Sequence, residues 1–239
     1  FMDKAYRADS DRELDANERA IYRSIVGKLI WMIGDRPDIA YATKELSRNV
    51  QQPLLEHYLA AKRILRYLQG TKDMVLHLVI DKTIPTEQIE VMVDASWANA
   101  ADRKSTTGGI LRLQGLLLAT WSRTQSVIAQ SSCEAELLAL NTGAIEGKLV
   151  VSILKEMRRK PVLVLRTDSA SAANSTRRRG LGRMRHLDIR ELWLQDEVRN
   201  GKLTIERVPG LRNTADILTK SMPGPRFVEL LRDLNLEVI

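Results

Sequence analysis

The run Val91-Met92-Val93-Asp94 constrains the fold of this chain more than any other stretch. Three apolar residues lead directly into an aspartate, and Ala95-Ser96-Trp97 follow. Such a run predicts a buried strand that ends in a carboxylate at the edge of a sheet. A buried carboxylate is costly unless it is paired with a charge or bound to a metal. The chain is therefore expected to place a partner, or a cation, beside Asp94.

Three later acidic residues lie in segments that could converge on Asp94. Asp168 follows the apolar run 162–167, which predicts a buried strand parallel to the first. Glu136 lies one turn inside a predicted helix, and Asp216 lies in the first turn of a late one. We expect the four carboxylates to form one divalent-metal site. Hard oxygen ligands select Mg²⁺ or Mn²⁺, and two such ions can cleave a phosphodiester.

Each of these acids also has an ordinary structural explanation. An aspartate after a strand is usually a turn residue or a helix cap. For any one of the four, taken alone, the structural role is the better interpretation. The metal site is favoured only by the pattern that all four make together.

Composition favours a nucleic-acid partner. The chain has 239 residues, is 44% hydrophobic and carries a net charge of +7. A basic balance of this size favours a polyanion, although a merely solvated basic surface is the alternative. The single cysteine, Cys133, excludes an intramolecular disulfide and a cysteine-based zinc site.

The expected location follows from the same features. No apolar run looks long enough to span a bilayer, and no signal peptide is visible. We expect a cytoplasmic or nuclear protein that is not secreted and has no membrane partner.

The N-terminal third is predicted to be helical. Residues 1–16 form a polar arm, and 17–80 form a small helical subdomain with helices over 20–33, 38–50 and 54–68. A strand is expected within 74–80. The polar, proline-containing segment 81–88 is expected to be a linker.

Residues 89–222 are predicted to form an α/β domain, followed by a C-terminal helix within 223–239. Strands over 89–94, 108–113 and 116–122 form an antiparallel meander, and strands over 162–167 and 202–208 follow. Helices are expected over 134–157, 170–176, 188–198 and 213–220. The result is a five-stranded mixed sheet flanked by helices.

This order of strands, helices and acids resembles the ribonuclease H fold with its four-acid site. Short sequence motifs make the resemblance more specific, because they are similar to segments of copia-type (Pseudoviridae) LTR-retrotransposon reverse transcriptase polyproteins. They are DRKSTTGG at 102–109, SSCEAE at 131–136, RHLDIR at 185–190 and ADILTK at 215–220. Residues 22–27 and 60–68 resemble the thumb or connection-like region after the polymerase palm of the same polyproteins.

The resemblance implies a function. Asp94, Glu136, Asp168 and Asp216 would be the catalytic, metal-binding acids of a ribonuclease H that degrades the RNA strand of RNA–DNA hybrids. Glu136 is preferred to Glu134 because it directly precedes an apolar run, as the family's glutamate does. The partners implied are the hybrid and the polymerase portion of the same polyprotein, in a virus-like particle.

The chain departs from the family pattern in three places. Ser96 stands where a second acid often occurs, and the loop 209–213 just before Asp216 has no histidine, so that Arg212 could supply charge there. No Tyr-x-Asp-Asp motif is present, so no polymerase active site is expected in this segment.

The basic, glycine-containing loop 177–186 is the best candidate for binding phosphates, since guanidinium groups suit bidentate phosphate contacts. A solvated loop is the alternative. The predicted nucleic-acid-binding residues are Arg103, Lys104, Arg123, Arg177, Arg178, Arg179, Arg183, Arg185, His186 and Arg212.

Two other functions compete with the hybrid nuclease. One is a non-catalytic or domesticated ribonuclease H-like module that binds nucleic acid or protein in a larger assembly. The other is a different nuclease or strand transferase of the same fold, such as an integrase, which the fourth acid argues against.

Overall fold

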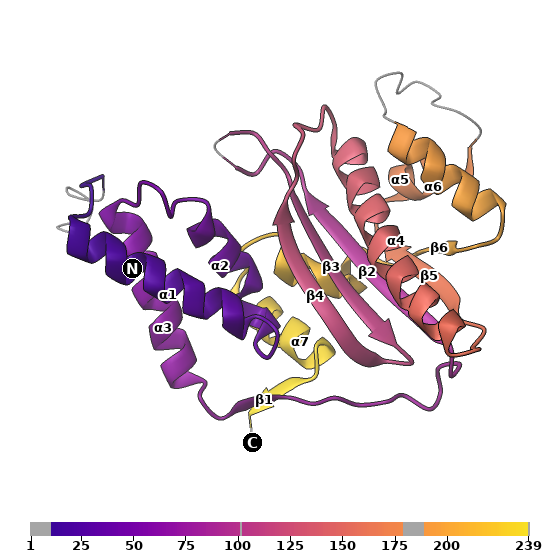
Figure 1. Cartoon of the computed structure of the whole chain (residues 1–239), viewed down its shortest axis with the longest axis horizontal. Helices are drawn as coiled ribbons and strands as arrows, with labels where there is room; N and C mark the ends of the chain where they lie inside the picture. The colour runs from indigo at the N-terminus through magenta and orange to yellow at the C-terminus, as the bar shows by residue number, and fades with distance from the viewer. Residues whose placement is uncertain (1–10, 101, 179–188, 239) are drawn as a thin grey trace. The chain divides into compact units, whose positions relative to one another are not determined.

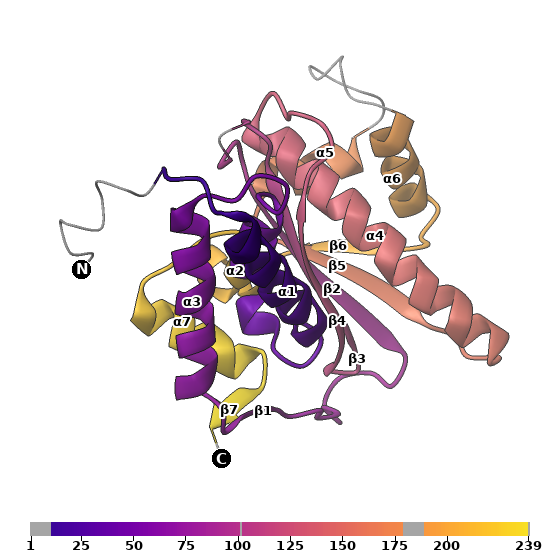
Figure 2. The ribbon, with the colours of Figure 1, turned by 60° about the vertical axis from the view of Figure 1, so that its left-hand side comes forward.

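A computed structural model of the chain describes residues 11–100, 102–178 and 189–238 (Figures 1 and 2). The chain divides into two compact units. The first comprises residues 1–76 with 236–239, and the second comprises residues 77–235. Each unit has its own core and is described by itself.

The first unit is helical, as the apolar periodicity predicts. It contains α1 (Ala16–Met32), the 3₁₀ turn η2 (Pro37–Ile39), α2 (Ala40–Ser47) and α3 (Leu55–Gly70). A capping box starts α1, in which Asp15 accepts from the Glu18 amide and the Glu18 carboxylate accepts from the Asp15 amide. Tyr22 is fully buried in the core and donates to the Leu46 carbonyl.

The last residues of the chain complete the first unit. Strand β1 (Met74–Leu76) pairs antiparallel with β7 (Leu236–Val238). The helix expected within 223–239 is α7 (Gly224–Asp233), which ends before Asn235, whose φ of 60° is incompatible with a helix. Strand pairing between residues so far apart in sequence leaves no local signal, and β7 was not predicted.

The second unit is built on a five-stranded mixed sheet in the order β4-β3-β2-β5-β6. Strands β2, β3 and β4 form the predicted antiparallel meander, and β5 and β6 run parallel to β2. This arrangement confirms the predicted fold class. The strands are β2 (Gln88–Ser96), β3 (Thr106–Leu113), β4 (Leu116–Thr124), β5 (Val162–Thr167) and β6 (Thr204–Arg207).

Helix α4 (Ser132–Glu156) covers one face of this sheet (Figure 2). It lies close to the strands because two of its residues are glycines. A Cβ on Gly143 would lie 2.7 Å from Val93 Cγ1, and one on Gly147 would lie 2.5 Å from Leu163 Cδ1. Close packing of this kind fixes the start of α4 relative to the end of β2.

The opposite face of the sheet carries the segment after β6. Successive residues of a strand point to opposite faces, so Met92 points away from the α4 layer. Its Sδ accepts from the Thr214 amide at 3.2 Å. The helix predicted over 213–220 is instead the 3₁₀ helix η4 (Thr214–Leu218), and a second 3₁₀ turn, η3 (Gly210–Arg212), precedes it. Two short helices, α5 (Ala170–Arg177) and α6 (Ile189–Arg199), follow β5.

Helix α4 corrects one expectation. By length and composition it is, within the described residues, a helix that could cross a membrane, whereas no apolar run was expected to be long enough. The core helix of a soluble protein meets the same criterion. Here the apolar residues Ala139, Leu140 and Ala144 are fully buried in the core of the second unit.

Candidate metal centre

Three of the four predicted acids meet at one end of the sheet. Asp94 lies in β2, Asp168 directly follows β5, and Glu136 lies in the first turns of α4. One carboxylate oxygen from each lies within 4.8 Å of the others. Because β2 and β5 are parallel neighbours, their carboxyl ends deliver Asp94 and Asp168 to the same place.

The start of α4 decides which glutamate joins this group. Ser131 caps the helix by accepting from the Glu134 amide at 3.2 Å. The Glu134 carboxylate turns back and accepts from the Gln130 amide at 2.7 Å. Glu134 therefore closes the helix start, and Glu136 faces the other two acids.

Burial makes these carboxylates costly to ionise. Asp94 is 4% exposed, and burial raises its pKa to about 6, with the charges of Asp216 and Asp168 adding to a shift that the Thr219 hydroxyl opposes. Burial, together with the charges of Asp94 and Asp168, raises the pKa of Glu136 to about 9. A divalent cation would remove this penalty.

The donor set fits Mg²⁺ or Mn²⁺. All the grouped ligands are carboxylate oxygens, which are hard ligands that suit these cations. Glu136 Oε2 is buried and has no hydrogen-bond partner among the described residues. A buried acceptor without a donor is uncommon in proteins, and here it belongs to one of the three grouped acids.

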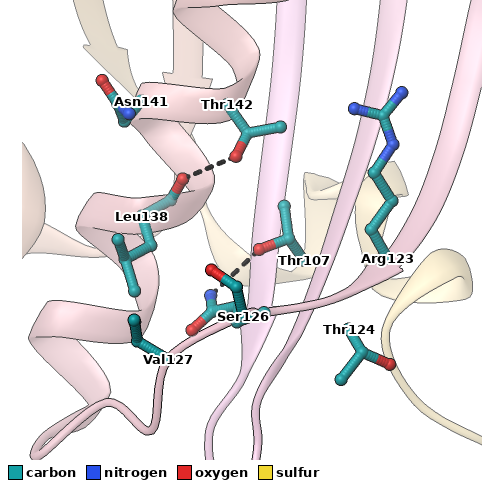
Figure 3. A pocket seen from close by; sticks show the side chains of 9 residues that line it. Thr107, Arg123, Thr124, Ser126, Val127, Leu138, Asn141 and Thr142 are labelled. Carbon is teal, nitrogen blue, oxygen red and sulfur yellow. Dashed lines mark hydrogen bonds between the residues drawn. The ribbon is translucent and has the colours of Figure 1, made fainter. Parts of the chain in front are cut away.

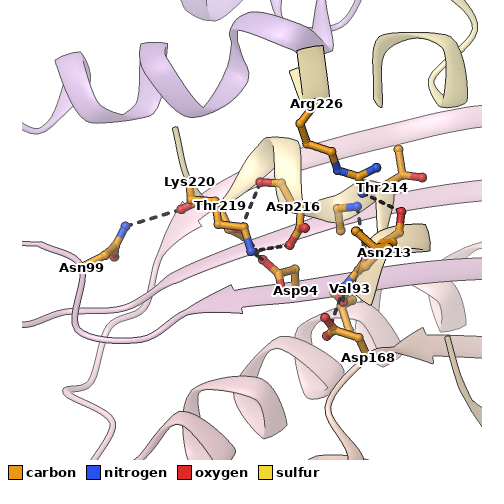
Figure 4. Close-up of polar contacts among 12 residues, drawn as sticks. Val93, Asp94, Asn99, Asp168, Asn213, Thr214, Asp216, Thr219, Lys220 and Arg226 are labelled. Carbon is orange, nitrogen blue, oxygen red and sulfur yellow. Dashed lines mark hydrogen bonds and ion pairs between the residues drawn. The ribbon is translucent and has the colours of Figure 1, made fainter. Parts of the chain in front are cut away.

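Asp216 lies beside the group without joining it. Its Oδ1 is 2.6 Å from Lys220 Nζ, which is also 4.0 Å from Asp94 Oδ2 (Figure 4). Burial lowers the pKa of Lys220, but the contacts with Asp216 and Asp94 outweigh burial and raise it. The neighbouring Thr219 hydroxyl donates to Asp94 Oδ2.

Asn213 forms hydrogen bonds to both Asp168 and the backbone of strand β2. It is fully buried, and its Nδ2 donates to the Val93 carbonyl at 3.1 Å and to Asp168 Oδ1 at 3.3 Å (Figure 4). Its Oδ1 accepts from the Ala215 amide and so caps η4. One side chain thus fixes the orientation of Asp168 and the position of the turn that carries Asp216.

Gly108 allows that turn to approach β3. A Cβ at this position would lie 2.6 Å from Thr219 Cγ2 and 2.8 Å from Leu218 Cβ. Contacts this short do not occur in proteins, so a larger residue would displace the segment that carries Asp216 and Lys220.

Sequence analysis did not predict Asn213, Thr219 or Lys220 as site residues. Two signals were present. Asp216 and Lys220 have the i, i+4 spacing of a helical ion pair, and Asn213 stands where an N-cap would stand. The segment ADILTK at 215–220 contains Asp216, Thr219 and Lys220.

Six of the predicted nucleic-acid-binding residues are described, and they differ in their surroundings. Arg103 is exposed in the turn between β2 and β3, next to the half-buried Lys104. Arg212 is exposed in η3, whose Gly210 approaches Asp168. Arg177 donates to the Ile205 carbonyl at 3.0 Å, and the exposed Arg178 follows it. The remaining predictions, Arg179, Arg183, Arg185 and His186, lie outside the described residues.

Arg123 lines a pocket of about 220 Å³ between β4 and α4 (Figure 3). Its guanidinium pairs with Glu146 at 2.6 Å and stacks near the Trp121 ring. Gln125, behind it, donates to Thr107 Oγ1 and to the Ala135 carbonyl. The pocket is lined by Thr107, Arg123, Thr124, Gln125, Ser126, Val127, Leu138, Asn141 and Thr142.

Comparison with solved structures finds ribonucleases H of low sequence identity. LC11-RNase H1, isolated from compost, aligns with 56% of this chain and 93% of its own at 15% identity and a TM-score of 0.45. RNase H1 from Halobacterium salinarum NRC-1 aligns with 55% of this chain and 94% of its own at 18% identity and a TM-score of 0.35. No protein-family model matches the chain.

Comparison with curated proteins finds transposon polyproteins. The "Retrovirus-related Pol polyprotein from transposon RE1" of Arabidopsis thaliana is 33% identical over 213 residues, which is 86% of this chain and 14% of the relative. The corresponding polyprotein "from transposon TNT 1-94" of Nicotiana tabacum is 33% identical over 217 residues, which is 89% of this chain and 16% of the relative. The chain therefore spans a small part of these relatives' length, and its homologues are the retrovirus-related Pol polyproteins of copia-type plant transposons.

Proposed function

We propose that this chain is a divalent-metal-dependent endonuclease that degrades the RNA strand of RNA–DNA hybrids as part of a retrotransposon reverse transcriptase. One observation carries the proposal. The oxygens of Asp94, Glu136 and Asp168 lie within 4.8 Å of one another at a sheet edge, where two of the three acids are buried. Carboxylates that repel each other in this way are typical of a site built for cations.

The four acids would differ in their roles as metal ligands. Bound Mg²⁺ ions would activate a water molecule and stabilise the leaving oxygen of the cleaved phosphodiester. Asp94, Glu136 and Asp168 would hold them, with Asp216 at the margin of the group. Thr219 and Asn213 fix the orientation of Asp94 and Asp168 through hydrogen bonds, so that the ligands are oriented in advance.

Basic residues around this edge would bind the hybrid. Arg103, Lys104 and Arg212 come from turns, Arg123 from β4, and Arg177 and Arg178 from the end of α5. Together with Arg179, Arg183, Arg185 and His186 they would contact phosphates. A hybrid is recognised through groove shape, phosphates and 2′-hydroxyl groups, so little base preference is expected.

The proposed partner protein is the polymerase portion of the same polyprotein. The relatives are Pol polyproteins, and this chain matches about one seventh of their length without a polymerase motif. The activity would serve reverse transcription in a cytoplasmic virus-like particle or in the nucleus.

Cleavage of a labelled RNA–DNA hybrid in Mg²⁺ tests the proposal. The wild-type chain should cut the RNA strand, and Asp94→Asn should lose cleavage by a factor of about 100 or more, because it removes a charge from the ligand set. The matched control is Asp196→Asn, an exposed aspartate of α6, which should cut normally.

Two other outcomes of this cleavage experiment would favour the alternative functions. Hybrid binding without cleavage by the wild-type chain would favour the non-catalytic module. Equal cutting of duplex DNA would favour a different nuclease of the same fold.

A further inference from the structure

Lys220 occupies the space between two of the acids. Its ammonium group is 2.6 Å from Asp216 Oδ1 and 4.0 Å from Asp94 Oδ2 (Figure 4). The side chains of Asp94 and Asp216 are 5% and 15% exposed, whereas that of Lys220 is 49% exposed. The lysine therefore reaches from solvent into a cluster of acids that is otherwise largely shielded from water.

Lys220 pairs with one of the four acids, Asp216, whereas the other three acids form a separate group. The oxygens of Asp94, Glu136 and Asp168 lie within 4.8 Å of one another, and Lys220 Nζ reaches this group only at its margin, 4.0 Å from Asp94 Oδ2. Asp216 is outside that group and is neutralised by Lys220 instead. The two sides of Asp94 thus present different surroundings to an incoming ion.

An ammonium group can stand in for a metal ion. It is a compact, strongly hydrated point charge, unlike the planar guanidinium of arginine. It satisfies two carboxylates at once, as a bridging cation would. Because the stem of Lys220 is half exposed, the group can move into solvent without breaking a packed core.

We propose that Lys220 is a positioning residue that holds Asp216 and takes the place of a second divalent ion between Asp94 and Asp216. The first ion then binds to Asp94, Glu136 and Asp168. A second ion binds only when it displaces the ammonium group, so the two ions have different affinities. This inference rests on the proposed function, since it concerns the same metal site.

Calorimetric titration of the full chain with Mn²⁺, at fixed pH and ionic strength, tests the inference. Lys220→Met removes the charge but keeps a similar length, and should tighten binding of the second ion by about fivefold, the equivalent of one modest ion pair. Lys220→Arg keeps the charge and should leave the second ion close to its wild-type affinity.

Two controls show whether tighter binding of the second Mn²⁺ ion is specific to the loss of Lys220. Lys202→Met removes a lysine from an ion pair with Glu197 that lies in another part of the second unit, and should change neither affinity. Thermal melting without metal shows whether each variant folds, and Lys220→Gln replaces Lys220→Met if the latter does not.

Unchanged or weaker binding of the second ion in Lys220→Met would overturn the inference, as would a second ion bound by neither protein. A second ion bound only by the variant would support it. The proposed function fails separately: if both ions bind as expected but no hybrid is cut, the role of Lys220 stands and the nuclease assignment does not.

Discussion

At the scale of single residues, the buried acids are the least favourable feature of the second unit in the absence of metal. Asp94 and Glu136 are each less than 10% exposed, and Glu136 Oε2 has no donor among the described residues. Such groups are retained at a cost to stability, which is typical of functional sites. Their energetics can be measured without any substrate.

The first prediction concerns pH and Glu136. Its pKa is raised from 4.5 to about 9, so the folded protein binds this proton more tightly than the unfolded chain does. The metal-free protein should therefore lose stability as pH rises from about 4.5 towards 9. Glu136→Gln removes the part of this loss that comes from Glu136, and at pH 8 it should be more stable than wild type by at least about 1 kcal/mol.

Melting curves in EDTA at pH 4 and pH 8 measure this difference. The two proteins should melt alike at pH 4, where the glutamate is protonated in both states. With Mg²⁺ at pH 8 the wild-type chain should gain more stability than the variant. A variant that is less stable at pH 8 in EDTA would contradict the assignment of Glu136.

The second prediction concerns Asn213. Asn213→Ala removes hydrogen bonds to Val93 and Asp168 and the cap of η4, and leaves buried acceptors without donors. Unfolding free energy should fall by about 1–3 kcal/mol, and Mn²⁺ binding should weaken. Asn200→Ala, at an exposed asparagine, is the control for urea denaturation and Mn²⁺ titration. Equal effects in both variants would show that Asn213 has no special role.

At the scale of helices and strands, local patterns predicted much of the fold. The apolar runs at 89–94 and 162–167 identified two strands and their parallel pairing, and the serines before Glu134 located the start of α4. The site followed because Asp94, Glu136 and Asp168 stand at the ends of those elements. What no local pattern showed was the pairing of β1 with β7 and the contact of Lys220 with Asp94, since both depend on long-range packing.

The 3₁₀ turns illustrate a related limit. Asn213–Lys220 has the composition of a short helix, yet the chain forms the 3₁₀ helix η4 there. The segment must bring Thr219 against Gly108 and Asn213 against Val93, and these tertiary contacts outweigh helix propensity.

The third prediction concerns the contact between α4 and β2. Gly143→Ala places a Cβ 2.7 Å from Val93 Cγ1, the tip of a stiff β-branched side chain. Overpacking should lower the unfolding free energy by about 1–3 kcal/mol and should weaken Mn²⁺ binding, because α4 carries Glu136.

Gly27→Ala is the control, and it should raise the unfolding free energy that Gly143→Ala lowers. Gly27 lies inside α1 with open space around it, so alanine should stabilise the chain by up to about 1 kcal/mol through helix propensity. Urea denaturation measures both variants. Stabilisation by Gly143→Ala would mean that α4 does not need this close approach.

At the scale of the whole molecule, charge would govern the proposed encounter with nucleic acid. The net charge is +7, and the second unit carries exposed arginines such as Arg103 and Arg212. Binding of a hybrid should therefore weaken as salt rises, because phosphate contacts release counterions.

The fourth prediction follows for Arg212. Hybrid binding measured by fluorescence anisotropy in EDTA, over a series of salt concentrations, gives the slope of log K against log salt. Arg212→Ala should reduce the magnitude of this slope by about one unit, as expected for one lost phosphate contact. Arg158→Ala, at an exposed arginine just beyond the far end of α4, should leave the slope unchanged. Equal slopes in all three proteins would exclude Arg212 from the interface.

The presence of a cation among Asp94, Glu136 and Asp168 can be observed directly. Crystals of the chain grown in Mn²⁺ should give an anomalous difference peak within coordination distance of all three carboxylates, and the same peak should be absent in crystals of Asp94→Asn. Well-diffracting crystals of the wild-type chain with millimolar Mn²⁺ and no anomalous density between these side chains would contradict the metal centre on which the nuclease assignment rests.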